Sequence, residues 1–143
     1  MSIKNIIMVI FLFISLLYSQ SFASDEKANP LNTTEYDQCI EKANGVTSSL
    51  RDCVSVETER LDKILNSSYK RIMRSKIDAK DKEKLKNIQR SWISYKDRMI
   101  EMIIKYSGDG TLASLGIDFA YEEMIKSQTV ILWNLSNDIN GEQ

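Results

Sequence analysis

The feature that most constrains this chain is a run of large apolar residues at steps of three and four. Residues three and four apart lie on one face of an α-helix, because the helix has about 3.6 residues per turn. The pattern therefore predicts a long amphipathic helix over this segment. Its apolar positions are Leu85, Ile88, Trp92, Tyr95, Met99, Met102 or Ile103, and Tyr106.

Three further segments carry helical periodicity and capping signals. Asn32 precedes Glu35 by three residues, as in a capping box, and Asn44-Gly45 can adopt the left-handed conformation that ends a helix. The polar tail from Asn137 to Gln143 is expected to fray. The expected elements are a short helix from about Thr34 to Ala43, a second capped by Thr47 or Ser48 and reaching Met73, the third after Asp78 or Asp81, and a fourth capped by Thr111 and reaching about Leu135.

The composition indicates an all-α fold. The chain has one proline and five glycines, and no useful run alternates apolar and polar residues with a period of two. The prediction is a small antiparallel helical bundle, with three main helices and a short N-terminal helix.

The first 23 residues have the anatomy of a secretory signal peptide. Lys4 precedes an apolar run from Ile6 to Tyr18, and Ser21-Phe22-Ala23 offers small residues before a cut after Ala23. The run is shorter than the roughly 20 residues that a membrane-spanning helix needs. We expect cleavage there, with Ser19 as a competing site. The domain is then residues 24–143, and the location is the periplasm or the exterior.

The two cysteines, Cys39 and Cys53, are expected to form a disulfide because an exported protein meets an oxidising compartment. Zinc is not expected, since the chain has no histidine and only two thiols. A bond between these positions would staple the short helix to the next one. Closing a loop of this length stabilises by about 3 kcal/mol in the chain-entropy model.

Composition also narrows the function classes. Without Lys4 the formal charge changes from −1 to −2, so neither nucleic acid nor a membrane is expected as a partner after cleavage. Without histidine, a free thiol or a glycine-rich phosphate loop, no enzyme activity, cofactor or metal is expected. A catalytic pair of carboxylates would have to come from Glu57, Asp97, Glu101, Glu122 and Glu123. Their spacing brings no two of them together on an apolar face of one helix.

One constellation on the third helix stands out. Gln89, Trp92 and Lys96 share a helical face, with Asp97 beside them, and the preceding helix carries Asn66 and Tyr69. The favoured interpretation is that Trp92 and Tyr69 belong to the core while Asn66, Gln89 and Lys96 fix the register of the helices. The alternative is a binding surface.

In order, these residues resemble the lysozyme-inhibitor LprI-like domain family of small exported bacterial proteins. The motifs span about Tyr36 to Asp97, with a weaker match through Thr129. They are Cys39, Gly45-Val46-Thr47, Cys53, Leu65-Asn66-Ser67-Ser68-Tyr69 and Gln89-Arg90-Ser91-Trp92-Ile93-Ser94-Tyr95-Lys96-Asp97.

The resemblance implies an all-helical fold with a Cys39–Cys53 bridge. It also implies lysozyme inhibition as the expected function. The chain departs from the family pattern where many members carry a second cysteine pair, since Ile100 and Met124 stand near those places. Lys96 stands where arginine is frequent, and lysine cannot reproduce a bidentate guanidinium contact.

Three functions are consistent with an exported helical binding module. The first is a protein that blocks lysozyme or another cell-wall hydrolase, with the Asn44-to-Ser48 turn or the Ser107-to-Thr111 loop entering the target's cleft. The second is an immunity protein that neutralises a cognate toxin in the periplasm. The third is a structural or stress protein of the envelope. Each of the first two requires a protein partner.

Overall fold

The structure is a computed structural model that describes residues 30–31 and 33–141. The expected signal peptide lies outside these residues. The chain divides into two units at Asn32; of the first, only Pro30 and Leu31, in a turn, are described. The second unit contains only helices among its described residues, which confirms the all-α bundle. Its elements are α2 (Thr34–Ala43), α3 (Thr47–Arg74), α4 (Ala79–Tyr106) and α5 (Thr111–Asn140).

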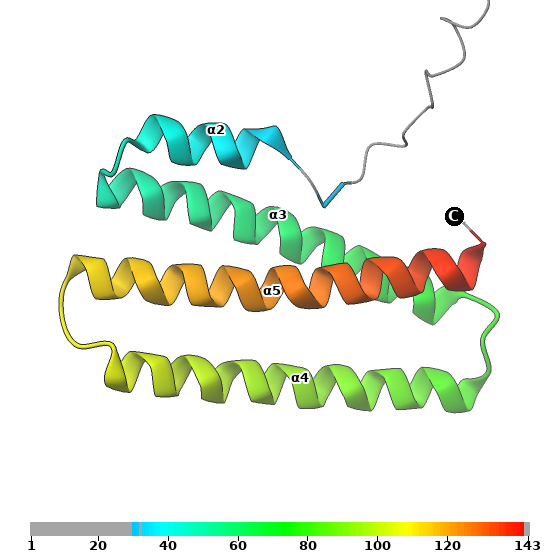
Figure 1. The fold of residues 1–143 in the computed structure, drawn as a ribbon. Helices are drawn as coiled ribbons and strands as arrows, with labels where there is room; N and C mark the ends of the chain where they lie inside the picture. The colour runs from blue at the N-terminus through cyan, green and yellow to red at the C-terminus, as the bar shows by residue number, and fades with distance from the viewer. Residues whose placement is uncertain (1–29, 32, 142–143) are drawn as a thin grey trace, which may run out of the picture. The chain divides into compact units, whose positions relative to one another are not determined.

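In this unit, consecutive helices run antiparallel, and α5 lies between α3 and α4 (Figure 1). The contact between α3 and α5 is the most extensive in the unit, α2 packs on α3, and α4 meets α5 over a smaller area. None of the described helices combines the length and apolar character needed to cross a bilayer.

Local chemistry explains the end of α2 and the start of α4. Asn44 and Gly45 both have positive φ, at 46° and 78°, and reverse the chain between α2 and α3. The Asp78 side chain caps α4 by accepting a hydrogen bond from the Asp81 backbone N–H at 2.7 Å. The expected caps at Thr47 or Ser48 and at Thr111 are wrong, because all three residues lie inside their helices. Thr47 and Thr111 begin their helices, after Val46 and Gly110, which have no capping side-chain oxygen.

The expected fraying from Asn137 is wrong for the described part of the tail. α5 continues through Asn140 and ends at Gly141, which adopts the left-handed conformation. Ser136 is buried, and the Arg71 guanidinium donates a hydrogen bond to the Asn137 side chain at 3.3 Å. Tertiary contacts with α3 therefore hold a polar segment that local composition alone would leave loose.

The disulfide between Cys39 and Cys53 is present and joins α2 to the second turn of α3. Their Cα atoms are 5.7 Å apart, and Cys53 is buried while Cys39 is half-buried. The predicted staple is confirmed. It fastens a helix of 10 residues that has a single buried residue, Ala43.

An apolar cluster joins the three long helices near the turn between α3 and α4. Leu65 and Ile72 come from α3, Leu85 from α4 and Leu132 from α5. In contrast, most of the regular apolar stripe of α4 stays partly exposed, because Leu85 and Gln89 are its only buried residues. The helix was predicted correctly, but its stripe is not fully covered within this unit.

Candidate functional site

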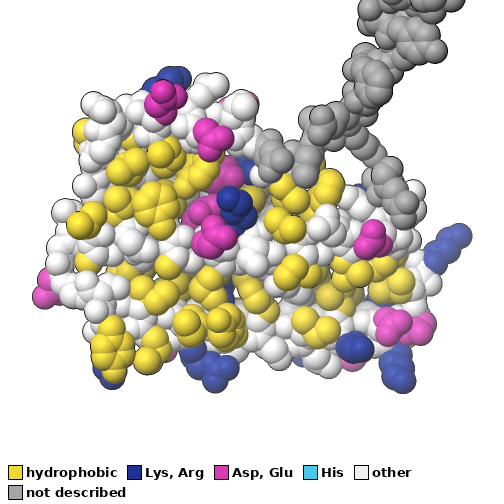
Figure 2. All heavy atoms as spheres, viewed as in Figure 1, with side chains coloured by type: hydrophobic (Ala, Val, Ile, Leu, Met, Phe, Trp, Pro, Cys, Tyr) yellow, Lys and Arg dark blue, Asp and Glu magenta, His cyan; other side chains and the backbone are white. Residues whose placement is uncertain are grey.

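A hollow of about 640 Å³ lies between α2 and the first half of α3. Its wall is largely apolar and includes the disulfide, Tyr36 and Val56, a residue that is 70% exposed. Glu35 and Asp52 are exposed and also line it. Figure 2 shows hydrophobic and acidic side chains gathered together over these two helices.

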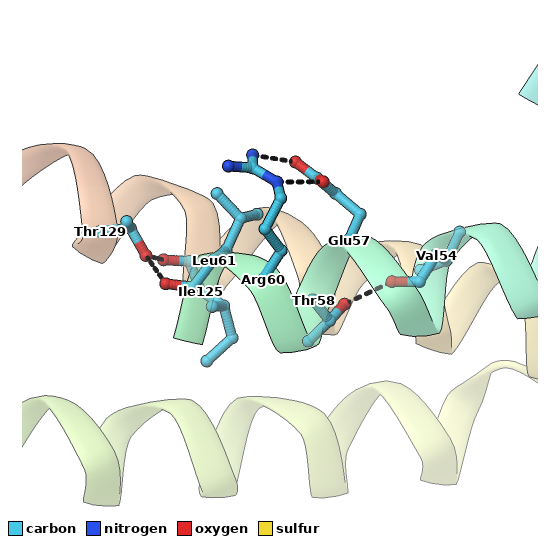
Figure 3. Close-up of polar contacts among 7 residues, drawn as sticks. All are labelled: Val54, Glu57, Thr58, Arg60, Leu61, Ile125 and Thr129. Atoms are coloured by element: carbon cyan, nitrogen blue, oxygen red, sulfur yellow. Dashed lines mark hydrogen bonds and ion pairs between the residues drawn. The ribbon is translucent and has the colours of Figure 1, made fainter. Parts of the chain in front are cut away.

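An ion pair between a half-buried arginine and a buried glutamate forms part of the lining of this hollow. Glu57 and Arg60 lie three residues apart on α3, so their side chains meet on one face of the helix. The Arg60 guanidinium donates from Nε and Nη2 to the two Glu57 oxygens, at 2.7 Å and 2.6 Å (Figure 3). This bidentate geometry compensates for placing a carboxylate at a core position of α3.

Glu122 of α5 brings a second buried carboxylate to the same region. Its side chain is 4% exposed, and Oε1 accepts no hydrogen bond from a described residue. Burial raises the pKa of Glu122, and the negative charges of Glu123 and Glu57 add to this effect. Burial also raises the pKa of Tyr36 to about 12, with further contributions from Glu122 and Glu57. Tyr36, Glu57, Arg60 and Glu122 thus form one polar cluster built from three helices.

The carboxylates and the guanidinium of this cluster can bind a charged group of a partner. The cluster contains no side chain that is activated as a nucleophile. Among the described residues, no group of three or more acidic or cysteine side chains could hold a metal ion. Glu57 and Glu122 were considered in the sequence, but spacing along one helix cannot pair residues on different helices. The available signal was their position: Glu57 lies four residues from Cys53 and Leu61, and Glu122 lies three from Ile125, all of which are buried.

Two further contacts fix α3 against α5 around the cluster. The buried Thr129 hydroxyl donates to the Ile125 carbonyl at 2.7 Å and also lies 3.2 Å from the Leu61 carbonyl across the interface (Figure 3). Arg51 pairs with Asp118 at 2.5 Å, where both side chains are partly exposed. These contacts join α3 to α5 on either side of Glu122 along α5.

The six residues singled out in the sequence divide into two groups. Trp92 and Tyr69 pack against the apolar cluster, and Gln89 is buried, with no described partner for its Nε2 atom. The Lys96 ammonium lies 4.6 Å from the centroid of the Tyr121 ring of α5 and donates to Asp97 at 2.7 Å.

The remaining two residues, Asn66 and Asp97, are exposed. The Asn66 amide donates to the backbone and the side chain of Asp62 on its own helix, at 2.8 Å each. The structure therefore places Asn66 away from the seam that Gln89 and Lys96 line.

Comparison with known proteins gives one match. A family model described as "Lysozyme inhibitor LprI" matches residues 32–130. No curated protein and no solved structure matches the chain. The matched range holds α2, α3, α4, the first two thirds of α5, both cysteines and all four residues of the polar cluster.

Proposed function

The chain belongs to the lysozyme inhibitor LprI family, and we propose that it is an exported protein that binds and blocks lysozyme or another cell-wall hydrolase. The match across residues 32–130 carries this proposal, since it covers more than half of the chain. The expected signal peptide at residues 1–23 supports export to the compartment where such hydrolases act.

The acidic face formed by α2 and the first half of α3 is the surface that we assign to the target. Residues 33–62 hold seven acidic and three basic residues, and so carry a formal charge of −4. Lysozyme is a basic protein, and opposite charges steer association and fix the orientation of the complex. The overall charge of −1 conceals this concentration.

The hollow on this face suits a basic side chain of the target. Apolar walls can hold the stem of an arginine or lysine, while Glu35 and Asp52 at the rim can pair with its charged head. Together with Glu57, these acids outnumber Lys42 and Arg60, the basic residues of the lining. Ala43 and Ser49 also line the hollow, so the Asn44-to-Ser48 turn adjoins it. We assign to this turn the projecting contact with the target's cleft. The Ser107-to-Thr111 loop lies at the same end of the bundle (Figure 1) and is the second candidate.

The constellation on α4 has a different role in this proposal. Gln89 is buried on α4, and Trp92 and Tyr69 pack against the apolar cluster. Lys96 lies over the Tyr121 ring of α5, and we assign to these α4 residues the register of the helices. Asn66 and Asp97 are exposed and remain candidates for contact with a partner.

The test uses the exported, oxidised protein and lysozymes of several types. Lysis of cell-wall suspensions should slow as the protein is added, and calorimetry should report a complex. Replacing both rim acids, as Glu35→Gln/Asp52→Asn, should weaken binding about tenfold and flatten its salt dependence.

The matched control is Glu83→Gln/Glu101→Gln, which removes two exposed acids from α4 and leaves the acidic face intact. It should bind within about twofold of the parent protein. Equal losses in the two variants would reject the acidic face as the binding site. No binding or inhibition with any lysozyme would reject the inhibitor function, and the cognate toxin of an immunity protein would be the next target to test.

A further inference from the structure

The outer flank of α4 carries a row of exposed apolar side chains, which we call the apolar ridge. It consists of Ile88, Tyr95, Met99, Met102 and Tyr106, which are between 38% and 71% exposed. At about 100° per residue, the ridge lies roughly 80° around α4 from the face that holds Leu85, Gln89 and Trp92. Figure 2 shows hydrophobic side chains exposed along α4. Within the described unit, this ridge is only partly covered.

Basic residues border the ridge on its solvent side. Lys84 and Arg98 precede Ile88 and Met102 by four residues, and Lys105 continues the same line. None of these three forms an ion pair with a described residue; the ion pairs of α4 are Lys86–Glu83 and Lys96–Asp97. The combination of an apolar row with a cationic border is typical of helices that lie in the headgroup region of a membrane.

Charge is distributed unevenly between α4 and the rest of the described unit. α4 holds eight basic and four acidic residues, a formal charge of +4. The other residues between 33 and 141 hold nine basic and thirteen acidic residues, a formal charge of −4. The net charge of the whole chain, from which no membrane partner was expected, averages these two surfaces and hides both.

We propose that the apolar ridge and its basic border dock on the surface of an anionic phospholipid bilayer, without crossing it. The ridge would enter the boundary between headgroups and acyl chains, while Lys84, Arg98 and Lys105 meet lipid phosphates. A second copy of the chain is the less favourable occupant, because pairing two ridges would bring their two basic borders together. This docking does not depend on lysozyme binding and leaves the acidic face turned to other partners.

The experiment measures co-sedimentation of the exported full-length product, with its N-terminus identified by mass spectrometry, with lipid vesicles. Vesicles of phosphatidylcholine alone are compared with vesicles that also contain phosphatidylglycerol. The protein should bind the anionic vesicles, and salt should weaken that binding. Met99→Ser/Met102→Ser should reduce vesicle binding at least about tenfold, because the variant lacks two apolar side chains that would enter the bilayer.

α4 offers a matched control for the ridge. Ile93 and Ile104 lie on its opposite flank with similar exposure, 48% and 54%, so Ile93→Ser/Ile104→Ser should bind within about twofold of the parent. For charge, Lys84→Gln/Arg98→Gln should lose several-fold in binding, whereas Lys70→Gln/Lys76→Gln, outside α4, should not. Circular dichroism and thermal melts establish that each variant is folded.

Two results would overturn the proposal. One is the failure of the parent protein to bind anionic vesicles, or equal binding by the ridge variant and its control. The other is a dimer in sedimentation equilibrium without lipid that Met99→Ser/Met102→Ser dissociates, together with no vesicle binding. That second result would assign the ridge to another copy of this chain.

Discussion

α4 and α5 are similar in length, but their sequences and environments contrast. α4 has regular steps of three and four between its apolar residues, yet buries only Leu85 and Gln89. α5 has a less regular pattern and buries more. Its buried residues are Leu115, Glu122, Ile125, Gln128, Thr129, Leu132 and Ser136. A central helix has neighbours on two sides, so its buried surface is broad and its periodicity is blurred. Regular spacing therefore identifies a helix, but it does not measure how much of that helix is covered.

The largest expected difference comes from truncating one apolar side chain on each helix. Leu132 is 1% exposed in the shared core, so Leu132→Ala should lower the free energy of unfolding by about 2–5 kcal/mol. Met102 is 51% exposed, and Met102→Ala should cost less than about 0.5 kcal/mol. Urea denaturation of both variants measures the two costs. A Met102 cost as large as that of Leu132 would mean that the ridge is already covered in solution.

Removing the disulfide tests whether α2 needs its covalent attachment to stay folded and whether α3 and α5 stay folded without it. Cys39→Ser/Cys53→Ser should lower the free energy of unfolding by about 3 kcal/mol. Hydrogen exchange should rise mainly in α2, because this helix has one buried residue and packs mainly on α3. Equal acceleration in α5 would show that the staple supports the whole bundle.

A smaller loss of stability is expected from removing a hydrogen bond that crosses the α3–α5 interface. Removing a hydrogen bond within one helix should cost less still. Thr129→Val removes a buried hydroxyl that contacts the Leu61 carbonyl of α3, and should cost about 1 kcal/mol. Thr58 provides the control, since its hydroxyl donates only to Val54 of its own helix at 2.8 Å and is half-buried (Figure 3). Thermal melts should place Thr58→Val closer to the parent protein. The reverse order would mean that the contact across the interface adds no stability.

The sequence predicted the features that depend on neighbours along the chain. The four helices, the reversal at Asn44-Gly45 and an aspartate cap at Asp78 or Asp81 follow from local spacing and chemistry, and Asp78 is the cap that forms. The Cys39–Cys53 staple followed from the expected export to an oxidising compartment. The tail after Asn137 and the partial exposure of the α4 stripe were not predictable, because each depends on what a distant helix covers.

The polar cluster was beyond sequence reasoning for the same reason. Glu57 and Glu122 lie 65 positions apart, and the packing of α5 on α3 brings these two buried carboxylates into one region. Gln89 and Lys96 were correctly placed together on one face of α4, but Asn66 was not predictable as their partner. Its amide finds Asp62 one turn earlier on α3.

The smallest expected change in stability concerns Glu122, the buried carboxylate of α5, and this change depends on pH. Burial raises the pKa of Glu122, so the folded state retains a proton that the unfolded chain releases. This group therefore contributes stability below the ordinary carboxyl pKa range, and the contribution is lost as pH rises through the raised value. Glu122→Gln cannot ionise, and at neutral pH it should equal or exceed the parent in stability by up to about 1 kcal/mol.

The pH profile distinguishes this effect from a general change in packing. The advantage of Glu122→Gln should disappear in acid, where the parent carboxyl is also neutral, and Glu123→Gln, at the exposed neighbouring position, should show no such trend. Chemical denaturation at several pH values measures both. A glutamine variant less stable than the parent at neutral pH would mean that the bundle uses the ionised carboxylate.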